Sequence, residues 1–322
     1  MHKIFIDGQA GTTGIKIHQY LEGRDDLEIL EIAAPDRKDE RVKYDLVNEA
    51  DLVILCLPDE PAKRTVKLAA NSKARMLDAS TAHRVDREWI YGLPELKTGT
   101  GARQRDAIIS ANKVSNPGCY PTGFLLAIRP LVASGILNPD TALTISAVSG
   151  YTGGGRGMIE RYEARAKSHP DSLWYSRPYA LPMNHKHVPE MKYYAGLSIA
   201  PMFLPSVGHF PQGMLVSTPL SETWLRKKVT PAEVSTLLAE AYADEECIRV
   251  HEANDESALE QGQLEPQANN DTNQVDLFVF GTKAQILLIA RLDNLGKGAA
   301  GAAVQNLNLM LGIPEFTGIS TK

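Results

Sequence analysis

Short apolar runs alternate with helix-like patterns through the N-terminal part of the chain. A glycine-rich turn at 8–14 precedes residues 15–21, whose apolar positions recur at helical spacing, and Pro58-Asp59-Glu60-Pro61 is typical of a second helix start. The apolar runs that predict strands cover 3–6, 27–33, 51–57 and 75–78. This succession of strands and helices predicts an α/β, doubly wound sheet, that is, an N-terminal Rossmann domain.

The second half of the chain follows a different pattern. Longer apolar runs with fewer helices between them predict strands over 141–148, 213–219, 274–280 and 285–292. Thr230-Pro231-Ala232-Glu233 predicts a helix start, because a capping box coincides with proline at the first helical position. We therefore expect an α+β domain, with a polar surface loop at 260–272. A last helix is expected over 302–311, ended by Gly312.

These patterns predict two domains. Residues 1–117 are expected to form the Rossmann domain, which the closing segment 293–322 completes when its helix returns to it. Residues 118–292 are expected to form the α+β domain. At 322 residues, the chain is long enough for two substantial cores.

Composition and charge narrow the classes of partner. The net charge of −5 gives no broad attraction to nucleic acid or to an anionic membrane, and the longest apolar stretches are shorter than a membrane span. The N-terminus runs directly into strand-like sequence and leaves no room for a signal peptide. Three widely spaced cysteines (Cys56, Cys119 and Cys247) predict neither a disulfide framework nor a metal site. We expect a cytoplasmic protein that binds neither nucleic acid nor membrane.

Cys119 stands in the most informative segment, Ser115-Asn116-Pro117-Gly118-Cys119-Tyr120-Pro121-Thr122-Gly123. Asn-Pro-Gly is turn chemistry, and the apolar run after Pro121 predicts a helix with proline in its first turn. Cys119 is therefore expected at a helix N-terminus, where the helix dipole lowers a thiol's pKa and free N–H groups hold an oxyanion. This position favours a thiolate nucleophile that attacks a carbonyl. The alternative for an isolated cysteine is a small buried thiol with a structural role.

The glycine turn after the first strand has the spacing of a dinucleotide-binding fingerprint. Gly8, Gly11 and Gly14 allow a backbone to approach a pyrophosphate at a helix N-terminus. Beyond the second strand, Arg37 and Lys38 stand where an acidic residue would favour NAD, and a basic pair there favours the 2′-phosphate of NADP. The alternative for this pair is a solvated turn.

Several motifs together resemble the N-acetyl-γ-glutamyl-phosphate reductase family, of the shorter of its two types, within the aspartate-semialdehyde dehydrogenase superfamily. The cysteine motif and the closing motif are highly specific together, and the resemblance runs nearly end to end. The motifs that carry it are 8–14 (GQAGTTG), 77–84 (LDASTAHR), 91–96 (YGLPEL), 116–122 (NPGCYPT), 149–156 (SGYTGGGR), 185–190 (HKHVPE) and 293–301 (DNLGKGAAG).

The resemblance implies an NADPH-dependent oxidoreductase of arginine biosynthesis that converts an acyl phosphate to a semialdehyde. Cys119 would displace phosphate and form a thioester, which accepts hydride and collapses through a hemithioacetal. His187 is expected to exchange the proton, with His185 as the alternate. The family also implies a homo-oligomer, a dimer or a tetramer, with a small-molecule acyl-phosphate substrate.

Further site residues follow from the matched motifs. Arg84, Asn116, Arg156 and Glu190 are expected to bind the substrate, whose phosphate and carboxylate require compact cationic sites. The cofactor is expected to contact the glycine turn with Gly8, Gly11, Thr12, Thr13 and Gly14, the basic pair Arg37 and Lys38, and the closing residues Asn294 and Lys297. No metal is expected.

Two other functions fit part of the sequence. A relative that acts on aspartyl phosphate would carry the same thiol chemistry. A non-catalytic NADP-binding regulator would keep the Rossmann domain and use Cys119 structurally. A cysteine hydrolase is disfavoured, because nothing in that class requires the N-terminal βαβ pattern.

Overall fold

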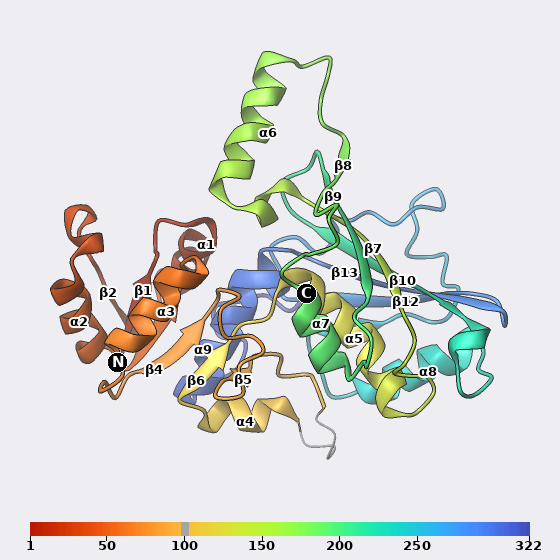
Figure 1. Ribbon diagram of the computed structural model, residues 1–322, viewed down its shortest axis with the longest axis horizontal. Coiled ribbons are helices and arrows are strands. Elements are labelled where there is room, and N and C mark those ends of the chain that lie inside the picture. The colour runs from red at the N-terminus through yellow and green to blue at the C-terminus, as the bar shows by residue number, and fades with distance from the viewer. Residues whose placement is uncertain (98–102) are drawn as a thin grey trace. The chain divides into compact units, whose positions relative to one another are not determined.

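The computed structural model describes residues 1–97 and 103–322 and contains two compact units, each with its own sheet (Figure 1). Unit 1 consists of 1–117 and 299–319, and unit 2 consists of 118–298 and 320–322. No helix among the described residues is long and apolar enough to cross a membrane.

Unit 1 contains the predicted doubly wound sheet. All its strand pairs are parallel, and both faces of the sheet are buried. The strand order is β2 (Leu27–Leu30), β1 (His2–Asp7), β3 (Leu52–Leu55), β4 (Arg75–Asp78), β6 (Lys113–Ser115) and β5 (Ile90–Tyr91). The helices of this unit are α1 (Thr12–Leu21), α2 (Glu40–Glu49), α3 (Asp59–Leu68), α4 (Gln104–Ser110) and α9 (Gly301–Leu311), with the short 3₁₀ turn η1 (Ala34–Lys38).

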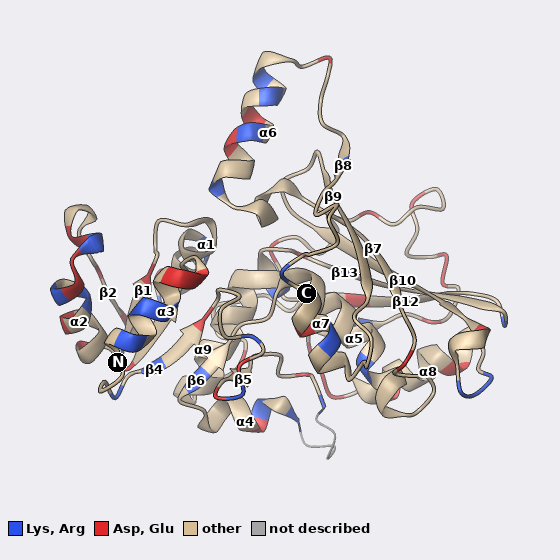
Figure 2. Cartoon of the chain, viewed as in Figure 1, with Lys and Arg blue, Asp and Glu red and all other residues tan. Residues whose placement is uncertain are grey.

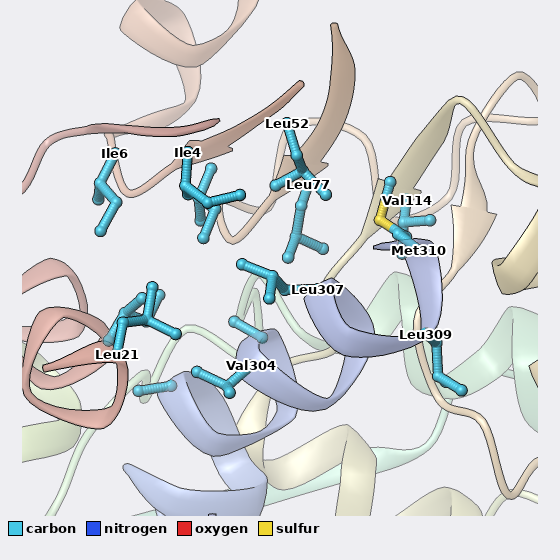
Figure 3. Close-up of a cluster of buried hydrophobic side chains, with 14 of the residues drawn as sticks. Ile4, Ile6, Leu21, Leu52, Leu77, Val114, Val304, Leu307, Leu309 and Met310 are labelled. Atoms are coloured by element: carbon cyan, nitrogen blue, oxygen red, sulfur yellow. The ribbon is translucent and has the colours of Figure 1, made fainter. Parts of the chain in front are cut away.

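The closing helix α9 is part of the core of unit 1, as predicted. It packs against α1, α4 and β4, and its apolar side chains Val304, Leu307 and Met310 lie under the sheet (Figure 3). Gly312, in the left-handed conformation with φ of 71°, ends the helix. A segment nearly two hundred residues away in sequence therefore completes the N-terminal core.

Some predicted bounds in unit 1 were wrong. The second strand ends at Leu30 and not at residue 33, because the chain turns through extended Ala33 into η1. Helices α2 and α4 and strands β5 and β6 were not predicted. Val47 is the buried residue of α2, so the apolar positions of this helix give only a weak periodic signal in the sequence.

Unit 2 contains a mixed sheet, as predicted for an α+β domain. Its strand order is β11 (Ile248–Val250), β12 (Val275–Gly281), β13 (Gln285–Leu292), β10 (Met214–Ser221), β7 (Thr144–Ser149), β9 (Met202–Gly208) and β8 (Ser176–Pro178). Its helices are α5 (Cys119–Ala133), α6 (Arg156–Ser168), α7 (Val188–Ala195) and α8 (Pro231–Ala241). The capping box predicted for α8 is present, with Thr230 and Glu233 bonded to each other's backbone N–H groups.

Helices α5 and α8 cover one face of this sheet. Helix α5 lies directly on the strands at Gly123, where an added Cβ would stand 3.1 Å from the Ala290 side chain. Side chains that point to the opposite face alternate with the buried ones along the strands and remain partly exposed. They include Met202 and Leu204 of β9, Leu215 of β10, and Leu287 and Ile289 of β13.

Replacing Leu307 with alanine should lower the free energy of unfolding by about 2–4 kcal/mol, because it leaves a cavity in the core that α9 completes. Urea unfolding followed by circular dichroism measures the change. Leu311→Ala, at a partly buried position of the same helix, is the matched control and should cost clearly less. Equal losses for both variants would contradict the assignment of Leu307 to the core.

Candidate active site

Cys119 is the first residue of α5, which confirms its predicted position at a helix start. The preceding Gly118 is extended, with φ of −75° and ψ of 154°, and no side chain caps the helix. The thiol is neither fully buried nor fully exposed. The helix dipole therefore acts on a thiol that a small molecule can reach, which favours the thiolate form.

The backbone on both sides of Cys119 is anchored. The N–H of Gly118 donates to the Glu190 carboxylate at 3.2 Å, and Glu190 is a buried residue of α7. Tyr120 is also buried, and its ring packs against Phe203 with centroids 4.9 Å apart. At Gly298 a third segment passes so close that an added Cβ would stand 2.7 Å from Cys119 Cβ. The backbone and Cβ of Cys119 are therefore held in a defined position.

Both candidate histidines lie around Tyr120, the residue that follows the cysteine. The ring centroids of His185 and His187 are each 5.9 Å from that of Tyr120 and 4.7 Å from each other. His187 is buried at the N-terminal cap of α7. The structure thus places both histidines against the residue that follows Cys119 and Glu190 against the residue that precedes it.

The closing motif connects three loops within unit 2. Asn294 Oδ1 accepts from the Gly213 N–H at 2.8 Å, and Asn294 Nδ2 donates to Thr152 Oγ1 at 3.0 Å. Lys297 lies fully buried in the π-helical turn Gly296–Ala300. Burial raises the pKa of the Asp293 carboxyl, although backbone N–H groups of neighbouring loops donate to it. These contacts fix the loop that brings Gly298 to Cys119.

In unit 1, steric contacts explain the glycine turn. Gly8 has φ of +98°, and an added Cβ would overlap the Cys56 carbonyl oxygen. A Cβ at Gly14 would stand 2.5 Å from the Gly8 carbonyl oxygen. Gly11 precedes α1, so Thr12 and Thr13 provide its first N–H groups. The turn leaves backbone accessible at a helix N-terminus, which suits a pyrophosphate.

A basic cavity of about 750 Å³ lies beside this turn. Leu57, whose side chain is next to Gly8, forms part of its wall. The sequence predicted Arg37 and Lys38 here, and both line the cavity from η1. Three further cations were missed because they come from α2 and α3, where Figure 2 colours several positions as Lys or Arg: Lys43, Arg64 and Lys67. The basic lining of the cavity suits a phosphate group, so the residues of unit 1 fit NADP, which carries a 2′-phosphate.

The glycine turn also presents an unused acceptor. Gln9 Nε2 is within 3.4 Å of the Ile32 carbonyl oxygen at the end of the second strand region. Gln9 Oε1 is buried and accepts no hydrogen bond from residues 1–97 or 103–322. A nucleotide hydroxyl or amino group could satisfy it.

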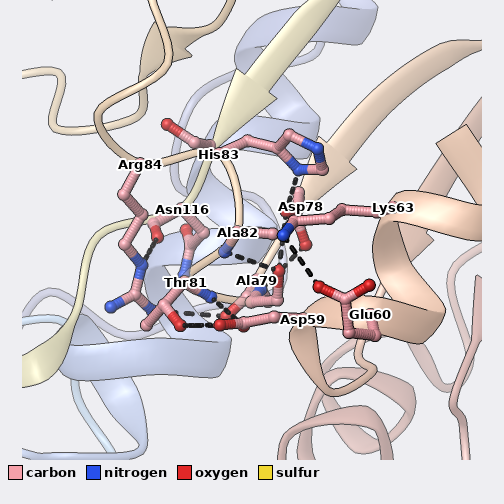
Figure 4. A network of polar contacts seen from close by, with 12 residues as sticks. Asp59, Glu60, Lys63, Asp78, Ala79, Thr81, Ala82, His83, Arg84 and Asn116 are labelled. Carbon is pink, nitrogen blue, oxygen red and sulfur yellow. Dashed lines mark hydrogen bonds and ion pairs between the residues drawn. The ribbon is translucent and has the colours of Figure 1, made fainter. Parts of the chain in front are cut away.

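A buried polar network follows β4 (Figure 4). His83 Nδ1 lies 2.6 Å from Asp78 Oδ2, and the His83 ring stacks on Trp89. Arg84 Nε donates to the Asn116 carbonyl oxygen at 2.9 Å, so two of the predicted substrate residues touch each other. The Asn116 side chain donates to the Ala299 carbonyl oxygen. These bonds hold the residues just before the cysteine motif.

Arg156 follows the glycine run 153–155, as predicted, and begins α6. Its guanidinium is exposed and pairs with Glu160 at 2.8 Å. Among the described residues, no group of three or more His, Cys, Asp or Glu could hold a metal ion.

The other two cysteines are in different surroundings. Desolvation by burial, together with the carboxylates of Asp78 and Asp7, raises the pKa of the Cys56 thiol to about 12. Cys247 is fully buried. Neither thiol stands at a helix start, which leaves Cys119 as the nucleophile candidate.

Comparison with known proteins gives matches along nearly the whole chain. Residues 3–102 match the family described as "Semialdehyde dehydrogenase, NAD binding domain", and residues 119–294 match "Semialdehyde dehydrogenase, dimerisation domain". The chain is 48% identical to N-acetyl-gamma-glutamyl-phosphate reductase 2 of Nostoc sp., over 98% of this chain and 99% of that protein. It is 46% identical to N-acetyl-gamma-glutamyl-phosphate reductase of Brucella anthropi, over 96% and 98%.

Solved structures share the fold. Aspartate semialdehyde dehydrogenase II of Vibrio cholerae superimposes with a TM-score of 0.72 at 16% identity, covering 97% of this chain and 98% of that one. Aspartate semialdehyde dehydrogenase with NADP from Candida albicans gives 0.66 at 14% identity, covering 97% and 98%.

Gly298→Ala should lower kcat by more than about tenfold, because the new methyl group would displace the Cys119 side chain and a small misplacement of a reacting group has a large cost. Steady-state kinetics measures the effect. Gly157→Ala is the control, since a Cβ there meets nothing within 4 Å. Unchanged turnover in Gly298→Ala would mean that the close approach does not position the thiol.

Proposed function

Because the chain belongs to the N-acetyl-γ-glutamyl-phosphate reductase family of semialdehyde dehydrogenases, we propose that it reduces N-acetyl-γ-glutamyl phosphate to N-acetylglutamate semialdehyde with NADPH. Phosphate is the second product, and the reaction belongs to arginine biosynthesis. The observation that carries the proposal is Cys119 at the start of α5, between two anchored neighbours.

The first step is acyl transfer to sulfur. The Cys119 thiolate adds to the acyl carbon, and the carbonyl electrons move to its oxygen. Backbone N–H groups of the first turn of α5 stabilise this oxyanion. When the carbonyl reforms, the bond to the phosphate oxygen breaks and phosphate leaves with the electron pair. The acyl group is then a thioester on Cys119.

The second step is reduction of the thioester. NADPH, when bound, supplies the hydride that converts the thioester carbon to a hemithioacetal. His187 takes the proton of the Cys119 thiol at the outset and later gives a proton to the oxyanion. As the hemithioacetal collapses, its oxygen returns that proton to His187, the carbonyl forms, the C–S bond breaks and the Cys119 thiolate is regenerated. The semialdehyde is released.

The cofactor is assigned to unit 1. Gly8, Gly11 and Gly14, with the N–H groups of Thr12 and Thr13, would hold the pyrophosphate. Arg37 and Lys38, together with Arg64 and Lys67 of the basic cavity, would hold the 2′-phosphate, whereas Lys43 is paired with Asp7 at 2.9 Å. Asn294 and Lys297 are also proposed for the cofactor, because they stand in the closing motif 293–301.

Four residues are proposed for the substrate, each on the evidence of its own motif. Arg84 and Arg156 are the candidates for the phosphate and carboxylate, since both are cations in motifs that the family shares. Asn116 and Glu190 are proposed to act through the backbone. The Asn116 side chain donates to the Ala299 carbonyl oxygen, and the Glu190 carboxylate accepts from the Gly118 N–H. The contacts that support these roles are hydrogen bonds within each unit.

A homo-oligomer in the cytoplasm is also proposed. The face of the unit 2 sheet opposite α5 and α8 carries partly exposed apolar side chains, among them Met202, Leu204 and Ile289. Exposed apolar surface of this kind is typical of an interface between subunits. The match of residues 119–294 to a dimerisation domain supports this assignment.

The protein should oxidise N-acetylglutamate semialdehyde in the presence of NADP⁺ and phosphate, and aspartate semialdehyde much more slowly. Cys119→Ser should abolish turnover, because a hydroxyl is a far weaker nucleophile at neutral pH, while NADPH binding stays intact. The absorbance of NADPH measures turnover, and fluorescence titration measures binding. Cys56→Ser is the control and should stay active. Retention of more than a few per cent of activity in Cys119→Ser would exclude the thioester route.

Replacing Arg37 and Lys38 together with alanine should narrow the preference for NADPH over NADH by about 1–3 kcal/mol, a typical contribution of charge-assisted hydrogen bonds. The ratio of dissociation constants for the two cofactors measures it. Arg41→Ala, an exposed cation of α2 outside the cavity, is the matched control. An unchanged ratio would place the 2′-phosphate contacts elsewhere.

A further inference from the structure

A chain of side-chain hydrogen bonds runs through unit 2 beside Cys119. We call His185, Tyr179, Tyr120 and Ser149 the polar chain. Tyr179 Oη lies 3.3 Å from His185 Nε2 and donates to Tyr120 Oη at 3.1 Å. A side-chain hydrogen bond joins Tyr120 to Ser149. The polar chain therefore links the residue after Cys119 to the segment that carries both histidines.

A backbone N–H sets the donor and acceptor roles at the His185 end of the polar chain. His185 Nδ1 accepts from the His187 N–H at 3.1 Å, so the proton of the neutral His185 ring is on Nε2. Nε2–H then donates to Tyr179, whose own proton goes to Tyr120. At the other end of the polar chain, Ser149 Oγ donates to the Gly150 carbonyl oxygen at 3.2 Å.

These donor and acceptor roles restrict His185. Both of its nitrogens are engaged, one as acceptor and one as donor. A proton on Nδ1 would face the His187 N–H and break that bond, so His185 is poorly suited to take a proton from the thiol. Burial raises the pKa of both Tyr120 and Tyr179 well above the usual range, and a negative Cys119 raises both further. The tyrosines therefore stay protonated and serve as neutral links.

We propose that Tyr179 is a positioning residue that holds His185 as the neutral Nε2–H ring and thereby leaves His187 to exchange the proton with Cys119 and substrate. The inference rests on the proposed function and decides between its two histidines. Through Tyr120, the same bonds fix the first turn of α5. Tyr179 and Ser149 acquire a role that their sequence context did not indicate.

Titratable groups from several described segments lie near His185. Tyr120 and Cys119 come from α5, Tyr179 from the segment after β8, and His187 and Glu190 from α7, with the exposed Lys186 beside them in sequence. Phe203 packs on the ring from β9. A pH titration that follows each histidine separately therefore distinguishes the two roles.

Tyr179→Phe tests the positioning role by kinetics. It removes only the hydroxyl, and we expect kcat to fall about tenfold, as for one lost hydrogen bond, with KM changed less than about twofold. Tyr175→Phe is the matched control, because its side chain is 70% exposed, and it should behave as the unmodified protein. His185→Gln keeps a donor for Tyr179 and should retain more activity than His185→Leu. If Tyr179→Phe matched Tyr175→Phe, or if Gln gave no rescue, the inference would be overturned.

Nitrogen-15 NMR of the imidazole rings tests the protonation states directly. Between about pH 8 and about pH 6, where an ordinary histidine titrates, His185 should keep the shifts of a neutral Nε2–H ring while His187 titrates with the pH limb of kcat. His187→Asn and His185→Gln assign the signals. Titration of His185 with that limb would overturn the inference. Activity of Cys119→Ser would instead overturn the proposed function, so the two failures are distinguishable.

Discussion

The hydrogen bond from the Gly118 N–H to the Glu190 carboxylate is the contact on which the proposed chemistry depends. It joins the residue before Cys119 to a buried side chain of α7, and His187 is the N-cap of the same helix. Cys119 and His187, the two residues proposed to act together, thus stand at the starts of two helices that one hydrogen bond connects. A carboxylate that accepts a backbone N–H in a buried site has little freedom to move, because an unpaired buried carboxylate is costly.

Sequence patterns predicted the parts of the fold that have strong local signals. The parallel strands of unit 1, the start of α5 at Cys119 and the capping box of α8 follow from apolar runs and from turn and capping residues. The α9 helix was predicted to return to the first core, and it does. Short strands such as β5 and β8 were missed, because two or three residues give no periodic signal and their pairing is set by neighbouring strands.

The candidate site could be predicted only where one segment carries it. The cysteine turn and the His185–Glu190 segment are contiguous, so their residues were identified together. The cations Lys43, Arg64 and Lys67 reach the basic cavity from two helices, and no spacing within one segment reveals that convergence. Tyr179 likewise depends on a through-space contact with Tyr120. The roles proposed for the site residues rest on the reactivity of their side chains, and the positions of these residues are compatible with those roles.

The central claim is that the acyl group passes through sulfur at Cys119. Its most direct test is to trap that intermediate: the protein is mixed with N-acetylglutamate semialdehyde and NADP⁺ without phosphate, quenched in acid and digested. Mass spectrometry of the peptides should show the N-acetylglutamyl group on the peptide that contains Cys119 and on neither of the peptides with Cys56 or Cys247. Two results would contradict the account. One is turnover with phosphate in a preparation that never carries the adduct on Cys119, and the other is an adduct on a different residue.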